Sequence, residues 1–184
     1  MSICLETPRL ILKSLTEADR GFFTQLYQHP ETMKYVGDPI SADEINEKFN
    51  SRLAAWNKHS VHRLCLVIFD KANHTPVGVT GFMAKWLPYQ QAEVGYLLHP
   101  SQQGKGYGKE SLQAVLQFAF NDCLLHKITA TVTEGNIASS KLLENSGFIQ
   151  EGRIRDNFKL NQQWHNDLIY GLLNSDFLPA FTKN

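Results

Sequence analysis

Apolar residues fall into short runs bounded by polar and turn residues over much of this chain, a pattern typical of strands. The polar segment 70–75 joins two consecutive runs, which indicates an antiparallel pair. The runs that predict strands are Leu10–Leu15, Leu64–Phe69, Val77–Trp86, Ala92–Leu98, Lys127–Val132, Gly152–Leu160 and His165–Leu173.

Segments with a period of three to four residues predict helices between these runs. A helix near Glu17–Tyr27 follows the N-cap candidate Thr16, and further helical stretches come after it. Ser41, with Glu44 three residues on, forms a capping-box pattern for a helix running to about His59. A short helix is predicted for Ile137–Asn145. A longer one buries a single face, with apolar positions at Leu112, Val115, Leu116, Ala119 and Phe120.

Strands come first, and a strand-helix-strand crossover follows, which predicts the α/β class with a mixed sheet. The 184 residues are 42% hydrophobic and contain no Pro/Ser-rich linker, internal repeat or low-complexity segment. A chain of this size buries one substantial core. We therefore expect a single domain over residues 1–184.

A glycine-rich loop lies between an apolar strand and an amphipathic helix, at residues 103–108. Its backbone N–H groups and the following helix N-terminus form a cradle for phosphate. Gly104 and Gly108 enclose three residues, and Lys109 precedes Glu110, so the loop lacks the spacing and the hydroxyl of a magnesium-dependent nucleotide site. The pattern G-x-G-x-G also differs from the dinucleotide fingerprint.

The loop does match Q-x-x-G-x-G, with Gln103, Gly106 and Gly108 at the fixed positions, and a second block runs from Asn136 to Phe148 as N-x-x-S…G-F. Together these blocks resemble the GNAT acetyltransferase superfamily, in particular its ribosomal-protein N-terminal (RimJ/RimL) branch. The opening TPRLILKSL and residues 151–170 are also similar to that branch. The resemblance implies the GNAT fold, with a mostly antiparallel sheet splayed at the cofactor site and flanked by helices, and an N-acetyltransferase that uses acetyl-CoA.

The resemblance also assigns the cofactor contacts. The pantetheine arm is expected along the backbone of Leu97, Leu98 and His99, where the Leu98 N–H would polarise the thioester carbonyl. Asn136 and Ser139 share one helix face and would meet the same ligand. The pyrophosphate is expected at Gln103, Gly104, Lys105, Gly106, Tyr107, Gly108 and Lys109.

The resemblance assigns the general acid and base less directly than the cofactor contacts, because two catalytic residues used in parts of the superfamily are replaced here by Thr131 and Leu143. Glu93 resembles the strand glutamate that serves as general base in histone-type acetyltransferases. Asp156, Glu134 or water are the alternatives for the base. Ser139 is left as the proton donor to the departing thiolate.

The acceptor amine is expected to be a protein N-terminus, for example of a ribosomal protein, as the resemblance implies. An α-amine with a pKa near 7.7 to 8.0 is roughly a tenth neutral at pH 7, so a weak or water-mediated base suffices. The alternatives are a small-molecule amine (polyamine, antibiotic or amino acid) and a non-catalytic acyl-CoA sensor. Aromatic residues that would wall a peptide groove are Tyr35, Trp56, Trp86, Tyr89, Phe158 and Trp164.

Charge and cysteine content restrict the remaining classes of function. Lys plus Arg and Asp plus Glu are 18 each, so nucleic acid and anionic membrane are not expected partners. Cys4, Cys65 and Cys123 lack C-x-x-C spacing, and the seven histidines lack metal spacing, so no disulfide framework or metal is expected. Residues 1–7 lack an export signal and no apolar run is long enough to span a bilayer. We therefore expect a cytoplasmic protein.

Overall fold

The computed structural model describes residues 2–177, which form one eight-stranded sheet in the order β1-β2-β3-β4-β5-β6-β8-β7. Only the neighbours β5 and β6 run parallel. The predicted α/β class with a mixed, mostly antiparallel sheet is therefore confirmed. Residue 1 and residues 178–184 of the predicted single domain lie outside the described residues. The strands are β1 (Cys4–Glu6), β2 (Leu10–Ser14), β3 (Leu66–Asp70), β4 (Pro76–Lys85), β5 (Gln91–Leu98), β6 (Lys127–Thr133), β7 (Ile149–Leu160) and β8 (Gln163–Leu173).

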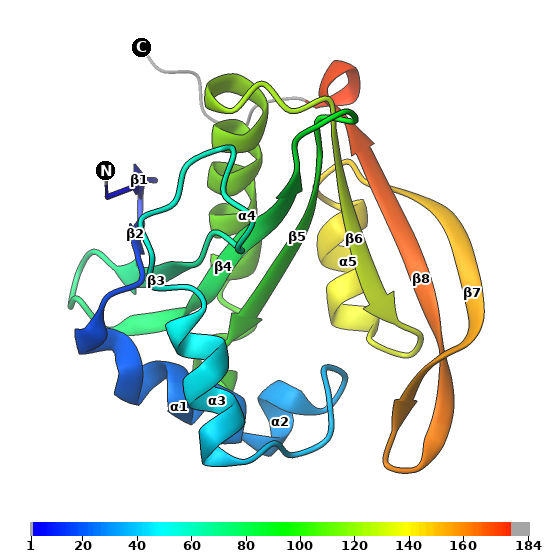
Figure 1. Ribbon diagram of the computed structural model, residues 1–184, viewed down its shortest axis with the longest axis horizontal. Helices are drawn as coiled ribbons and strands as arrows, with labels where there is room; N and C mark the ends of the chain where they lie inside the picture. The colour runs from blue at the N-terminus through cyan, green and yellow to red at the C-terminus, as the bar shows by residue number, and fades with distance from the viewer. Residues whose placement is uncertain (1, 178–184) are drawn as a thin grey trace.

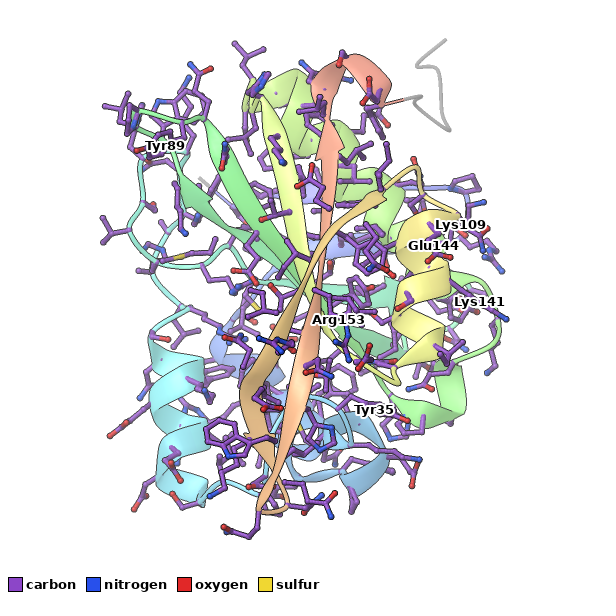
Figure 2. The ribbon with its side chains drawn as sticks, turned by 90° about the vertical axis from the view of Figure 1, so that its right-hand side faces the viewer. Tyr35, Tyr89, Lys109, Lys141, Glu144 and Arg153 are labelled. Atoms are coloured by element: carbon purple, nitrogen blue, oxygen red, sulfur yellow. The ribbon has the colours of Figure 1, made fainter. Side chains whose placement is uncertain are left out.

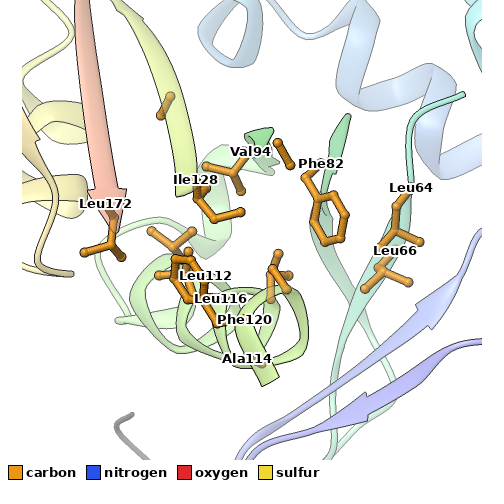
Figure 3. Packing of buried hydrophobic residues seen from close by; sticks show 14 of the residues in the cluster. Leu64, Leu66, Phe82, Val94, Leu112, Ala114, Leu116, Phe120, Ile128 and Leu172 are labelled. Carbon is orange, nitrogen blue, oxygen red and sulfur yellow. The ribbon is translucent and has the colours of Figure 1, made fainter. Parts of the chain in front are cut away.

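Helices cover both faces of the sheet. The α-helices are α1 (Arg20–Gln28), α2 (Pro30–Met33), α3 (Ala42–Asn50), α4 (Tyr107–Gln117) and α5 (Ile137–Glu144), and a π-helical turn, Phe118–Asp122, extends α4. On one face Leu66, Phe82 and Val94 pack with Leu112 and Leu116 of α4 (Figure 3). On the other face Val67 and Val79 pack with apolar residues of α1, α2 and α3. Because successive side chains of a strand point to opposite faces, the sheet packs against a separate hydrophobic core on each face.

One predicted helix boundary was wrong, and one short strand was not predicted. Helix α3 begins at the predicted capping box, in which the Glu44 N–H donates to Ser41 Oγ at 3.2 Å, but it ends at Asn50 rather than near His59. The chain leaves the helix because Trp56 packs in the opposite core, edge-on to Phe82 with ring centroids 5.3 Å apart. The short strand β1 was not predicted; its three residues carry too little pattern to stand out.

Strands β5 and β6 separate along their length, and this separation positions the site. They pair only at Gln91–Glu93 with Lys127–Thr129, whereas β5 continues beside β4 to Leu98 and β6 beside β8 to Thr133. Figure 1 shows the two strands diverging towards α2 and the loop that follows it. Beyond the paired residues, each strand therefore has one edge without a neighbouring strand.

Candidate active site

A cavity of about 760 Å³ occupies the region where β5 and β6 diverge. At one end its walls are the glycine loop and the start of α4, including Gln103, Gly108 and Lys109. At the other end they come from α1, α2 and the turns that follow α2 and α3, including Thr32, Tyr35 and Arg52. This volume lies within the range of small-molecule sites. A single continuous cavity thus joins the anion cradle to the helices on the opposite face of the sheet.

The cradle depends on backbone conformations that glycine adopts without strain. Gly104 has φ of 74° and Gly106, the N-cap of α4, has φ of 82°. A Cβ on Gly108 would lie 3.1 Å from Leu98 Cδ1 and 3.3 Å from Leu142 Cδ2. All three glycines line the cavity, so the unpaired N–H groups of the first turn of α4 open towards it. These residues fit the pyrophosphate of coenzyme A.

Arg9 fixes the cradle from outside. Its Nε lies 2.7 Å from Glu110 Oε2, its Nη1 donates to the Lys105 carbonyl at 3.0 Å, and its guanidinium lies 4.9 Å from the centroid of the Tyr107 ring. Burial raises the pKa of Glu110, but hydrogen bonds from Thr7 and Arg9 outweigh it and lower the pKa overall. The opening TPRL segment therefore serves to hold the loop.

The side chains of Lys105 and Tyr107 lie outside the cavity walls. Lys105 Nζ donates to Gln102 Oε1 at 2.9 Å, and the Tyr107 hydroxyl donates to Asp70. Gln103 Nε2 instead donates to the Leu98 carbonyl at 3.2 Å and ties the loop to the end of β5. Lys105 and Tyr107 therefore offer a ligand their backbone rather than their side chains.

Strand register decides which amides of β5 face the cavity. The His99 N–H donates to the Val77 carbonyl at 2.9 Å, so His99 belongs to a hydrogen-bonded pair with β4. Such pairs alternate in antiparallel strands, so Leu97 also directs its amide towards β4 while Leu98 directs its amide away. Of the three residues expected to contact pantetheine, only Leu98 offers its N–H to the region where the strands diverge.

Successive side chains of β5 point to opposite sides of the sheet. Tyr96 and Leu98 pack with the α4 core, and Leu97 packs with the α1–α3 core. Glu93 shares the side of Leu97 and lines the cavity there. The candidate base therefore lies on the side of the sheet covered by α1, α2 and α3, opposite the glycine loop and α4.

Ser139 shares a 2.8 Å hydrogen bond with the hydroxyl of Tyr96. Burial raises the pKa of Tyr96 to about 12, even though the bond to Ser139 acts in the opposite direction. The phenol therefore keeps its proton at neutral pH. Asn136 caps α5, with its Oδ1 accepting the Ser139 N–H at 3.3 Å. Sequence reasoning missed Tyr96, although its place three residues after Glu93 puts it on the other face of the strand.

The family described as acetyltransferase (GNAT) domain matches residues 9–149. This chain belongs to that family. Its domain is therefore an acetyl-CoA-dependent N-acetyltransferase with the GNAT fold, as predicted.

Three similar proteins illustrate the range of this family. The Bacillus subtilis (strain 168) protein named Probable N-acetyltransferase YjcK is 38% identical over 87 residues, about half of each chain (47% and 48%). A Vibrio cholerae spermidine N-acetyltransferase, solved with CoA and spermine, has a TM-score of 0.82 at 24% identity and covers 92% of this chain and 98% of its own. A Vibrio fischeri ribosomal-protein-S5-alanine acetyltransferase has a TM-score of 0.80 at 21% identity and covers 96% of this chain and 100% of its own.

Two of the alternative bases in this GNAT acetyltransferase are poorly placed for proton removal. Glu134 accepts from Arg153 Nε at 2.7 Å and Nη2 at 2.9 Å, and these bonds, with one from Asn166, lower its pKa to about 2. A carboxylate with so low a pKa is a weak base at neutral pH. Asp156 lies in an irregular part of β7 with φ of 48° and is not a cavity-lining residue. Glu93 and water therefore remain as candidates for the general base.

The aromatic residues expected to wall a peptide groove are dispersed. Tyr35 and Phe158 line the cavity of the acetyltransferase, whereas Trp56 is buried in the core. Tyr89 lies at the opposite end of the molecule from Tyr35 (Figure 2). Trp86 and Trp164 also lie outside the cavity walls. Two of the six expected aromatic residues therefore line the cavity.

Among residues 2–177, no cluster of three or more His, Cys, Asp or Glu side chains has the arrangement of a metal site. Within the same residues, no helix is both long enough and apolar enough to cross a membrane.

Proposed function

We propose that this GNAT acetyltransferase acts on the N-terminal α-amine of a protein, in the manner of the RimJ/RimL branch, for instance on a ribosomal protein. The proposal is carried by the placement of Glu93 and Tyr96 on opposite sides of one strand, at the point where the sheet opens. An acceptor entering past α2 and α3 reaches Glu93, while the cradle side carries the hydroxyl pair of Tyr96 and Ser139.

Each group has a defined role in direct transfer. Acetyl-CoA supplies the acetyl thioester as the second substrate. The Leu98 N–H donates to the thioester carbonyl oxygen as negative charge develops there. As the C–N bond forms, the acceptor nitrogen loses a proton towards Glu93. As the C–S bond breaks, Ser139 donates its proton to the sulfur and receives one from Tyr96. The proton taken up by Glu93 passes to solvent, and a proton from solvent restores Tyr96 after CoA leaves.

The distance along β5 favours a water-mediated base. Glu93 and Leu98 are five residues apart, about 17 Å along an extended strand. The glutamate side chain spans only part of this distance, so bound water carries the proton to it. This arrangement suits an α-amine, of which roughly a tenth is already neutral at pH 7, better than a lysine side chain with a pKa near 10.4.

Side chains of both charges line the cavity, with Glu31, Glu93 and Asp167 as well as Lys34, Arg52, Arg63 and Lys109. Arg52 and Arg63 line its acceptor end, and no carboxylate lies within 4.0 Å of either guanidinium among residues 2–177. A polycation such as spermidine would be repelled by the two arginines and attracted by the carboxylates of the cavity wall. The fold likeness to a spermidine N-acetyltransferase keeps this substrate class as the comparison to be tested.

The test compares acceptors at one pH with saturating acetyl-CoA. Peptides beginning with Ser or Ala are offered with free and with blocked N-termini, beside spermidine, an aminoglycoside and free amino acids. We expect transfer to the free N-termini and none to the blocked peptides. A small amine preferred by tenfold or more in kcat/KM would overturn the peptide proposal and leave the acetyl-CoA site intact. Transfer to no amine would favour the non-catalytic sensor.

A further inference from the structure

Two arginines contact the cavity at its acceptor end, and the mechanism above does not use them. Arg52 lies in the turn after α3, and Arg63 lies just before β3. Both are partly buried and both line the cavity. They approach β5 from the α1–α3 side, the side on which Glu93 lies.

Contacts with neutral groups hold both guanidinium groups in place. Arg63 Nη1 donates to the Glu93 carbonyl at 3.3 Å, and a Cβ on Gly95 would lie 3.2 Å from the same nitrogen. Arg52 Nη1 donates to the Tyr27 hydroxyl at 2.9 Å, and its guanidinium lies 5.3 Å from the centroid of the Phe23 ring. Each guanidinium carries five N–H donors, so most of them remain available.

Neither of these groups forms an ion pair with a carboxylate within 4.0 Å among residues 2–177. The ion pairs within residues 2–177 involve Arg9, Arg20, Lys71, Lys127 and Arg153, but neither Arg52 nor Arg63. Burial, followed by repulsion from Arg52, lowers the pKa of Arg63, while the Glu93 carboxylate opposes this change. Both guanidiniums belong to residues that line the same cavity. Partly buried arginines usually pair with an anion.

We propose that Arg63 and Arg52 together form a subsite for a carboxylate of the acceptor. This inference deepens the proposed function, on which it rests for the position of the amine. The planar fork of arginine suits bidentate binding of a carboxylate. A carboxylate bound here anchors the acceptor chain along the α1–α3 side of β5 and directs its amine towards Leu98.

Distance selects which carboxylate is bound. Gly95, beside Arg63, is three residues from Leu98, about 10 Å along the strand. An extended peptide advances at most about 3.6 Å per residue, so an acidic side chain at the second or third residue of the acceptor spans this interval. The α-carboxylate of a free amino acid lies too close to its own amine to reach Arg63 while the amine is at the reaction centre.

The first experiment uses the unmodified enzyme and matched acceptors. We compare kcat/KM at low salt for two pairs of peptides. One pair begins Ser-Ala-Asp and Ser-Ala-Asn, and the other pair carries the Asp or Asn as its second residue. We expect the acidic member to be preferred by about tenfold or more, as for a charge-assisted contact in a partly buried site. The inference is overturned if the acidic and amide peptides differ by less than twofold in kcat/KM in both pairs.

The second experiment removes the guanidinium. In Arg63→Gln the preference for the acidic peptide is expected to fall to about twofold or less through a higher KM, and Arg63→Lys should retain only part of it. Arg155→Gln is the matched control, because Arg155 is exposed and does not line the cavity. An unchanged preference in Arg63→Gln that has the circular dichroism spectrum of the wild type contradicts the assignment.

A parallel arm separates the sources of the carboxylate. Free serine is compared with serinamide, and Ser-Ala with its C-terminal amide. A carboxylate preference confined to free serine would overturn both the peptide acceptor and the arginine subsite, because that carboxylate cannot reach Arg63 while the amine is at the reaction centre. A preference confined to the acidic peptides supports both proposals. Efficient transfer to peptides without any carboxylate preference overturns the subsite alone.

Discussion

Side-chain direction on one strand separates the two halves of the proposed chemistry. Glu93 and Tyr96 are three residues apart in β5, so the pleat sends one towards the acceptor helices and the other towards α4 and α5. Tyr96 lies within hydrogen-bonding distance of Ser139, and burial keeps it protonated. This alternation places the proposed acid on the side of the glycine loop and the proposed base on the side of α1–α3.

Different pH dependences are expected for variants of these two residues: the Glu93 defect should vary with pH and the Tyr96 defect should not. Glu93→Gln should lower kcat/KM about tenfold at pH 7 and less at pH 9, because an α-amine with a pKa near 8 loses its proton unaided. Tyr96→Phe should lower kcat about tenfold or more, uniformly from pH 6 to 9, since the pKa of Tyr96 is about 12. Steady-state rates with a Ser-initiated peptide provide the measurement. A Glu93→Gln defect that does not change with pH would remove Glu93 as the base.

Ser139→Ala provides the control for this pair. If Tyr96 acts through Ser139, the double variant Tyr96→Phe/Ser139→Ala should be no slower than the worse single variant, because residues that act as a unit are not additive. Fully multiplicative losses would mean that the two hydroxyls act separately.

At the scale of elements, the glycine loop and α4 form a unit fixed by Arg9. The loop turns through two glycines with positive φ and delivers the first turn of α4 to the cavity. Arg9 holds it by bonding Glu110 and the Lys105 carbonyl. The loop conformation is therefore set before the ligand arrives, which reduces the entropy lost on binding.

Gly106→Val should weaken acetyl-CoA binding about tenfold or more, because a β-branched residue at φ of 82° is strained and its Cβ would lie 3.2 Å from Arg9 Nη2. Isothermal titration calorimetry measures the affinity. Gly21→Ala is the matched control, since a Cβ there meets nothing within 4 Å on helix α1. Equal affinities in folded Gly106→Val and wild type would place the cofactor elsewhere.

For the whole molecule, the divergence of β5 and β6 leaves β6, β8 and β7 attached to the rest of the sheet through a short paired stretch. Lys127–Thr129 of β6 pair with β5, and beyond them the three strands pair only with one another. At the far end of this unit Glu134 binds Arg153 of β7 and Asn166 of β8. These contacts fasten the turn after β6 to the hairpin beside the cavity.

The contacts of Glu134 with Arg153 and Asn166 should make the free energy of unfolding sensitive to acid. The pKa of Glu134 falls from an ordinary 4.5 to about 2 in the folded protein. Its stabilising effect is therefore present above about pH 4.5 and is lost as the pH falls towards 2. The free energy of unfolding in urea, measured between pH 7 and pH 3, should be lower for Glu134→Gln than for wild type at pH 7, with the gap closing in acid. Glu17→Gln, which breaks an exposed pair with Arg20 inside one turn, is the control. A gap independent of pH would refute the role.

Local pattern by itself determined much of this protein. Apolar runs predicted seven of the strands because burial on alternate faces imposes a period of two, and the glycine loop marked the anion cradle because only glycine adopts its backbone without strain. The two blocks around Gln103 and Asn136 indicated the family. Helix α3 was extended too far because the burial of Trp56 against Phe82 is a contact between distant segments.

Tertiary structure decided which of these residues meet. Register with β4 turned the Leu98 amide towards the cavity and the His99 amide away from it, and no local pattern carries that information. The fold brings Ser139 of α5 within hydrogen-bonding distance of Tyr96 of β5, and contact with Arg153 lowers the pKa of Glu134, one of the candidate bases. Arg52 and Arg63 are separated by ten residues of irregular chain, and only the fold brings them together at the acceptor end of the cavity. Sequence sets local conformation through short-range forces, whereas the site depends on contacts between segments that only the folded chain brings together.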